Sequence, residues 1–272
     1  MDHEYYSHTK DRLLQDPKIP LEVLADGPAV FEVMAREMAD FIKMRTAQGL
    51  PTVFILPVGP VGQYPRFVEI VNRERISLKN CWFFNMDEYL DDNKQWISKD
   101  HPLSFRGFMD RVVYSKICPE LNVQQQQRIF TDPNDPGRIS GLIERLGGVD
   151  ICFGGIGING LLAFNEPERE LSCEAYRALQ TRVLAISPET RTANAIGDFG
   201  GRLEDMPEWC VTIGFSQIIH ARKIRLGGFR DWHRAVVRRA AHGEMTPAFP
   251  VSLIAGHPDA LIRMTEFVAS PD

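Results

Sequence analysis

The stretch Cys81-Trp82-Phe83-Phe84-Asn85-Met86-Asp87-Glu88-Tyr89 joins a short apolar run directly to two acidic residues. An apolar run without alternation is typical of a strand that is buried on both faces of a parallel sheet. In such sheets, ligands bind beyond the carboxyl ends of the strands. The stretch therefore predicts the class of fold and the place of a site that contains Asp87. The alternative interpretation of Asp87 and Glu88 is a helix cap or a solvated acidic pair.

The same kind of run recurs along the chain and alternates with helical periodicity. Further strands are predicted at residues 52–56, 149–153, 182–186, 209–213, 223–226 and 260–264. Helices are predicted at residues 30–47, 65–72 and 139–146, with an amphipathic stretch at 105–113. Apolar strands separated by helices indicate an α/β protein with a mostly parallel sheet and helices on both faces.

The length and composition of the chain predict one domain. Its 272 residues are 44% hydrophobic, which is enough to bury a single large core. We expect residues 25–272 to form this α/β domain. Residues 1–24 are predicted to be an N-terminal arm or an oligomer contact, and the sequence fits both.

Charge and cysteine usage argue against several classes of partner. The formal net charge of −5 and the pI near 5.8 give no attraction to nucleic acid or to an anionic membrane surface. The five cysteines are scattered without a Cys-x-x-Cys pair, so neither a disulfide framework nor a zinc site is suggested. The N-terminus shows no apolar leader, and the chain has no apolar run long enough to span a membrane. Together with the scattered cysteines, these features predict a cytoplasmic protein.

A glycine-rich segment follows the predicted strand at residues 149–153. Glycines at positions 154, 155, 157 and 160 would let a ligand approach the backbone closely, with Gly155 and Gly157 at the centre. Asn165-Glu166-Pro167 then places a carboxylate on a rigid turn. A dinucleotide-binding interpretation fails because no phosphate-facing helix with an acid about 20 residues further on is evident. Glu166 as an ordinary surface acid is the alternative.

Cationic and turn residues follow other predicted strands. The loop after strand 52–56, which contains Gly59, leads into a helix whose N-terminus could hold an anion, although an ordinary connecting turn fits as well. Arg191 and Arg230 lie near loops further along the chain. A lone arginine is usually a surface residue, but two that converge on one cleft would fit a phosphate group.

Taken together, these motifs resemble the glucosamine-6-phosphate deaminase (isomerase) family, which is related in fold to the 6-phosphogluconolactonases. The resemblance extends from about residue 25 to 265. Besides residues 84–89 and 154–167, it rests on His101-Pro102 with Ser104, on residues 190–194, and on Ser252-Leu253 with His257-Pro258. It implies a modified Rossmann-like sheet, chemistry without a cofactor or metal, a sugar-phosphate ligand and a homo-oligomer.

The resemblance also implies roles for particular residues. Asp87 takes the place of the base that moves a proton between C1 and C2 of the open-chain sugar, and Glu166 that of the family's second catalytic acid. Arg191 and Arg230 take the places of two phosphate-binding cations, and Gly59, Gly155 and Gly157 lie in ligand-binding loops.

Two loops depart from the family's pattern. Asn159 replaces an aspartate, and Leu161 replaces the histidine that opens the sugar ring. Leucine cannot carry a proton, and an amide orients a hydroxyl without accepting its proton. In the first loop, Val58 and Val61 replace two hydroxyl ligands of the phosphate. Ring opening in the family's manner should therefore be absent, and the substrate should be altered.

Two functions remain open on the sequence. The first is an isomerase or deaminase that uses Asp87, with Glu166 and Asn159 in supporting roles, on a sugar that arrives open-chain. The second is a sugar-phosphate-binding regulatory protein that has kept the cleft and lost turnover. Only the enzyme predicts exchange of the C2 hydrogen with solvent.

Overall fold

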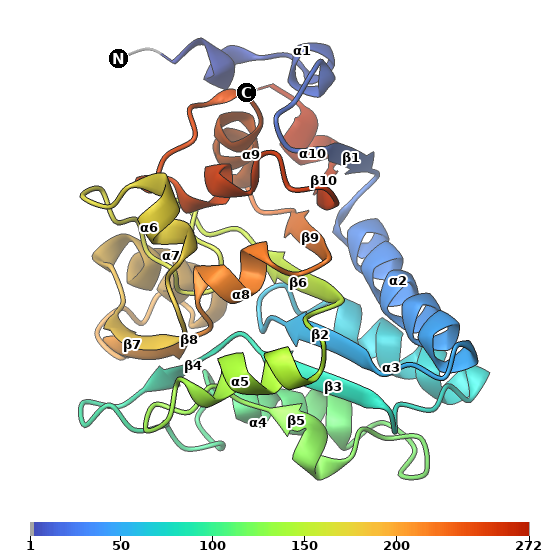
Figure 1. Ribbon diagram of the computed structural model, residues 1–272. Coiled ribbons are helices and arrows are strands. Elements are labelled where there is room, and N and C mark those ends of the chain that lie inside the picture. The colour runs from blue at the N-terminus through green and yellow to red at the C-terminus, as the bar shows by residue number, and fades with distance from the viewer. Residues whose placement is uncertain (1–2, 272) are drawn as a thin grey trace.

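A seven-stranded parallel sheet forms the centre of the computed structural model, which describes residues 3–271 (Figure 1). Its strands follow the order β1-β10-β9-β6-β2-β3-β5, and each neighbouring pair is parallel. The strands are β1 (Leu21–Leu24), β2 (Thr52–Leu56), β3 (Cys81–Asn85), β5 (Arg128–Ile129), β6 (Ile151–Gly155), β9 (Lys223–Gly228) and β10 (Ala260–Thr265). The predicted α/β class with a mostly parallel sheet is confirmed.

Alternate residues of the central strand β2 belong to two different hydrophobic clusters. Val53 and Ile55 pack into one cluster, whereas Phe54 and Leu56 pack into the other. Because successive side chains of a strand point to opposite faces, both faces of the sheet are covered, as the unbroken apolar run predicts.

Helices cover the two faces. Residues of α5 (Arg138–Arg145), α8 (Phe215–Ile219) and α9 (His233–His242) contribute to the first cluster. Residues of α2 (Gly27–Ala47), α3 (Gln63–Glu74) and α4 (Phe105–Met109) contribute to the second. The other helices are α1 (Lys10–Leu14), α6 (Cys173–Arg177), α7 (Pro188–Asp198) and α10 (Glu266–Ala269). Within residues 3–271, no helix is long and apolar enough to cross a membrane.

A second, three-stranded sheet lies beside the first and was not predicted. It consists of β4 (Asp87–Leu90), β8 (Trp209–Thr212) and β7 (Arg182–Ala185), and its pairings are antiparallel. The strands expected at 182–186 and 209–213 therefore exist, but their expected place in the parallel sheet is wrong. A short apolar run does not specify its partner strand, and this information was missing from the sequence pattern.

The chain passes from one sheet to the other at Met86. The Met86 N–H donates to the carbonyl of Leu56 in β2, and the Met86 carbonyl accepts from the N–H of Ile213 just after β8. Asp87 follows immediately as the first residue of β4. Its position is thus set by backbone hydrogen bonds to both sheets.

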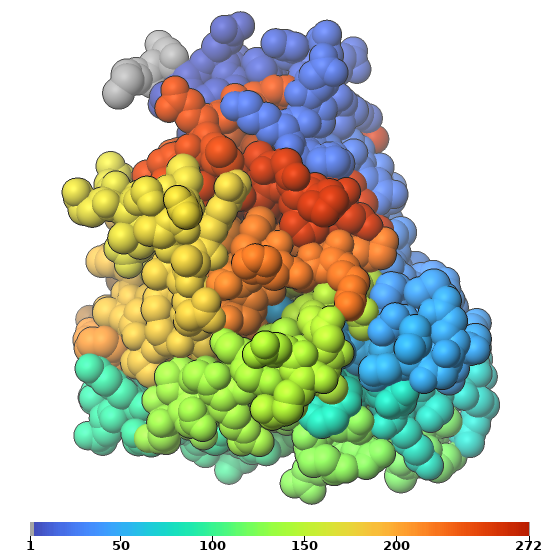
Figure 2. Space-filling view, viewed as in Figure 1, coloured from blue at the N-terminus to red at the C-terminus, as the bar shows by residue number. Residues whose placement is uncertain are grey.

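The described part of the expected N-terminal arm packs into the domain. Leu13 and Ile19 are fully buried, and β1 pairs with β10 along one edge of the parallel sheet. Figure 2 shows the N-terminal residues, in blue, directly against the C-terminal residues, in red. Residues 1 and 2 lie outside the described residues.

Residues 190–194, expected near a loop after a strand, lie within helix α7. The Ser187 hydroxyl accepts from the N–H of Thr190 and caps the helix, with Pro188 at the first helical position and Glu189 in the first turn. This is an ordinary N-terminal helix signature, and it was present in the sequence.

Candidate functional site

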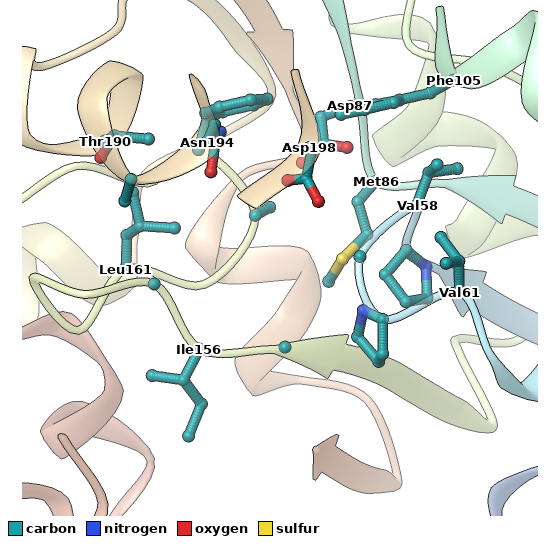
Figure 3. A pocket seen from close by; sticks show the side chains of 18 of the residues that line it. Val58, Val61, Met86, Asp87, Phe105, Ile156, Leu161, Thr190, Asn194 and Asp198 are labelled. Carbon is teal, nitrogen blue, oxygen red and sulfur yellow. The ribbon is translucent and has the colours of Figure 1, made fainter. Parts of the chain in front are cut away.

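A cavity of about 320 Å³ opens at the carboxyl ends of strands β2, β3, β6 and β9. Its wall is formed by the loops that follow these strands, by one face of α7 and by residues 102–108. This is the edge of the sheet at which the sequence predicted the site. Figure 3 shows Val58 and Val61 on the loop after β2, with Met86 beside them.

Asp87 lines this cavity (Figure 3), and its side chain is the one that the sequence placed at the centre of the site. Only 7% of the residue is exposed, yet no described residue donates a hydrogen bond to its carboxylate. Burial raises the pKa of Asp87 well above its usual range, and the neighbouring charge of Glu88 raises it further. An acid of this kind is suited to exchanging a proton with a ligand.

Glu88 differs from its neighbour because its carboxylate is fully used by the protein. It is completely buried and accepts five hydrogen bonds of 2.9–3.1 Å. The donors are the backbone N–H groups of Tyr89, Phe105 and Arg106, the Ser104 hydroxyl and the Arg106 guanidinium. The capping interpretation therefore holds for Glu88, which anchors the start of α4, and fails for Asp87.

Glu166 and Asn159 lie behind the cavity wall and are not among its lining residues. The Asn159 amide donates to Glu166 Oε2 at 2.8 Å and to Thr190 Oγ1 at 3.3 Å. The second Glu166 oxygen accepts from the N–H of Ser187 at 3.0 Å. Thr190 does line the cavity, so it is the group through which Glu166 and Asn159 connect to the site. Glu166, expected as an acid or an orienting group, is therefore connected to the cavity through Asn159 and Thr190.

Of the three predicted glycines, Gly155 serves a close contact within the protein. Gly59, Gly155 and Gly157 all line the cavity. A Cβ on Gly155 would lie 2.8 Å from the carbonyl oxygen of Gly59 and 3.1 Å from Cδ of Pro60. Glycine at position 155 therefore lets the loop after β2 lie against β6, and the close approach there is that of the protein's own backbone.

The two predicted cations do not converge. Arg230 lines the cavity and is paired with Asp198 at 2.7 Å. Arg191 does not line it, and its guanidinium binds the carbonyl of Met206 at 3.0 Å and Glu208 at 3.3 Å. The expectation of a two-arginine phosphate site is wrong.

Helical geometry explains where Arg191 lies. Thr190, Ala193, Asn194 and Asp198 line the cavity, and their spacing puts them on one face of α7. Arg191 is rotated by about 100° from Thr190 on such a helix, so it points away from the cavity.

Leu161, which the resemblance sets in the place of the ring-opening histidine, lines the cavity. Its backbone N–H donates to Asn159 Oδ1 at 3.2 Å, which fixes the turn that carries it. The side chain offers no proton to a ligand. The departure noted in the sequence thus falls within the site itself.

Several residues that line the cavity were not predicted from the sequence, among them His233. Its Nδ1 accepts from the N–H groups of Phe229 and Arg230, each at 2.9 Å, and its Nε2 lies 2.9 Å from the carbonyl oxygen of Ile156. Burial lowers the pKa of His233 to about 4, so the imidazole is neutral and joins two loops of the site. His257, in contrast, is not a lining residue, and its Nε2 binds the carbonyl of Ala221.

Tyr89, Asn194 and Asp198 were also missed as lining residues. The Asn194 amide donates to the Tyr89 hydroxyl at 2.9 Å. A helix predicted from Ser187 onward would have placed Asn194 and Asp198 on the face of Thr190. Among residues 3–271, no group of three or more histidine, cysteine, aspartate or glutamate side chains is arranged to hold a metal ion.

The fold and the site together define a class of protein: an α/β protein with a small-molecule pocket at the carboxyl edge of its parallel sheet and one unpaired acid in that pocket. No protein-family model matches the chain. It is 30% identical over 244 residues to a glucosamine-6-phosphate deaminase of Thermoanaerobacter pseudethanolicus, covering 88% of this chain and 91% of that protein. The chain therefore belongs to the glucosamine-6-phosphate deaminase family.

Other relatives agree with this assignment. A glucosamine-6-phosphate deaminase of Rhodopirellula baltica is 28% identical over 256 residues, covering 93% of this chain and 95% of that one. A solved structure of a monomeric glucosamine-6-phosphate deaminase has a TM-score of 0.79 at 25% identity, covering 92% of this chain and 99% of that one. The 6-phosphogluconolactonase of Trypanosoma cruzi, at 17% identity and a TM-score of 0.65 over 92% and 96% of the two chains, shares the fold.

Proposed function

We propose that this protein is an enzyme that moves a proton between C1 and C2 of an open-chain sugar, with Asp87 as the base. The observation that carries the proposal is the carboxylate of Asp87, which lines the cavity and receives no hydrogen bond from the described residues. A carboxylate held in this way is free to contact a ligand.

The chemistry follows from the position of one base beside a carbonyl compound. Asp87 removes the proton from C2, the electron pair forms the C1–C2 double bond, and the carbonyl oxygen takes up the negative charge. The proton of the C2 hydroxyl then moves to the oxygen on C1, and return of the abstracted proton to C1 gives the ketose. With an amine on C2, the same transfer gives an imine, which water hydrolyses to the ketose and ammonia. The raised pKa of Asp87 makes its carboxylate a stronger base for this step.

Glu166 and Asn159 act as positioning residues in this proposal. Glu166 holds the Asn159 amide, and Asn159 in turn holds the Thr190 hydroxyl at the cavity wall. Because Leu161 cannot shuttle a proton, the substrate arrives open-chain or opens without help from the protein. The substrate thus differs from that of the glucosamine-6-phosphate deaminases among its relatives, at least in how it reaches the open form.

A regulatory sugar-binding protein is the second candidate, and Leu161 is the observation that favours it. The replacement of a proton-carrying side chain in the wall of the cavity is what loss of turnover would produce. In that case Asp87 would only hydrogen-bond a ligand hydroxyl. The homo-oligomer, the cytoplasmic location and the absence of a cofactor, all implied by the sequence, remain predictions under either function.

Hydrogen exchange separates the two candidates. The protein is incubated in deuterated water with hexoses, amino hexoses and their 6-phosphates, and deuterium at C2 and released ammonia are followed by NMR. We expect incorporation for the wild type and none for Asp87→Asn. The matched control is Asp92→Asn, a change at an exposed acid on the same segment, which should retain exchange. A ligand that binds without any exchange would contradict the enzyme and support the regulatory protein.

A further inference from the structure

Among the described residues, no unpaired cation lines the cavity. Among the described residues that line it, the charged side chains are Asp87, Asp198 and Arg230, and His233 is neutral. The one cation, Arg230, is already neutralised by Asp198 at 2.7 Å. A phosphate dianion placed here would meet two carboxyl groups and a single, shared guanidinium.

The loop after β2 offers a ligand mainly apolar surface. Val58, Pro60 and Val61 line the cavity with side chains that carry no donor, and Pro60 also lacks a backbone N–H. The ring of Pro60 lies against the ends of β6 and β9. If Gly155 in β6 and Gly227 in β9 each carried a Cβ, that atom would lie 3.1 Å and 3.6 Å, respectively, from the ring. The loop is therefore packed in place with its apolar groups toward the cavity.

Uncharged polar groups are present elsewhere on the wall. The Asn194 amide and the Thr190 hydroxyl lie on α7, on the side of the cavity away from the β2 loop (Figure 3). The Tyr89 hydroxyl, on β4, accepts a hydrogen bond from the Asn194 amide. Groups of this kind pair with sugar hydroxyls without any need for a charge. The wall thus combines neutral hydrogen-bonding groups with an apolar end.

From this arrangement we infer that the ligand is an unphosphorylated sugar, whose terminal carbon lies against Val58 and Val61 and carries a hydroxyl or a hydrogen. The inference rests on the proposed function, because it assumes that the substrate binds in this cavity, and it adds the chemical class of that substrate. It departs from the 6-phosphate substrate named for the chain's relatives. The residues that carry it are Val58, Pro60, Val61 and the Arg230–Asp198 pair.

One competing feature is the N-terminus of α3, a helix of 12 residues that begins directly after this loop. Backbone N–H groups at a helix start attract anions, but their effect equals only about half an elementary charge. That is smaller than the charge of the phosphate, and the Arg230–Asp198 pair adds no net positive charge to it. Tighter binding of a phosphate ester would show that this helix end decides the specificity.

Binding of sugar alcohols tests the inference without any turnover. Calorimetry compares 2-amino-2-deoxy-D-glucitol with its 6-phosphate, because both are permanently open-chain, carry the same amine and lack the carbonyl needed for reaction. We expect the unphosphorylated compound to bind at least about tenfold more tightly, a difference of about 1.4 kcal/mol. Equal or tighter binding of the 6-phosphate, or no binding of the unphosphorylated compound, would overturn the inference.

A restoring variant provides the second measurement. Val58→Thr together with Val61→Thr adds two hydroxyls at nearly constant volume, and we expect the preference to shift toward the 6-phosphate by about tenfold. An unchanged ratio would overturn the role assigned to the two valines. The outcome is independent of the proposed catalysis, because hydrogen exchange at C2 reports on Asp87 whichever compound binds better.

Discussion

Asp87 and Glu88 are adjacent in the chain, and their side chains have opposite surroundings. Glu88 is completely buried and holds the start of α4 through five hydrogen bonds, whereas Asp87 has none to a described residue and lines the cavity. Both acids are nearly inaccessible, so burial alone does not distinguish them. The number of hydrogen bonds donated by the protein distinguishes them. It assigns a structural role to Glu88 and a chemical role to Asp87.

The raised pKa of Asp87 predicts the pH dependence of proton transfer. The base must be ionised, and burial together with the charge of Glu88 favours its protonated form. We therefore expect kcat/KM for C2 exchange to rise with pH until the raised pKa is passed and then to level off. Initial rates measured between about pH 5 and pH 9 check this, and a rate that is flat or falls with pH would count against Asp87 as the base.

At the scale of single elements, unbroken apolar runs were the reliable signal. Strand β2 was predicted with its observed bounds, because every side chain in it is buried. Strand β4 was missed, since Asp87 and Glu88 within it do not read as a strand. Helix α7 was missed although Ser187-Pro188 marks its start, and Arg191 was consequently placed in the site. Partner choice between the two sheets requires long-range contacts that no local pattern contains.

The junction of β6 with the loop after β2 predicts a contrast between two glycines. In Gly155→Ala the new Cβ would meet the carbonyl of Gly59 at 2.8 Å, so we expect the free energy of unfolding to fall by about 1–3 kcal/mol. In Gly141→Ala, on α5, the new Cβ would meet only the end of Arg145 at 3.6 Å, and we expect a gain of about 0.4–1 kcal/mol. Denaturant unfolding measures both, and equal effects would contradict the tight junction.

On the scale of the whole molecule, the chain from its first described residues to its last forms one body. The sheet is covered on both faces, and the N-terminal segment packs against α9 and β10. The sequence predicted the covered sheet from the apolar strands. It did not predict the docking of residues 3–24, because their few apolar side chains show no period that marks them as core.

Two neighbouring leucines test whether the N-terminal segment is part of the core. Leu13 is fully buried, so Leu13→Ala is expected to lower the free energy of unfolding by about 3 kcal/mol. Leu14 is 36% exposed, and Leu14→Ala should change it by no more than about 0.5 kcal/mol. Chemical unfolding of both variants is the measurement. A Leu13 variant as stable as the Leu14 variant would mean that this segment is a detachable arm.

The most direct measurement is the NMR signal of the hydrogen on C2 of a bound sugar in deuterated water. If Asp87 exchanges protons with that carbon, the signal disappears with wild-type protein and with Asp92→Asn, and persists with Asp87→Asn. Loss of the signal at the same rate with Asp87→Asn, or its persistence with wild-type protein and a ligand that demonstrably binds, would contradict the assignment of Asp87 as the base.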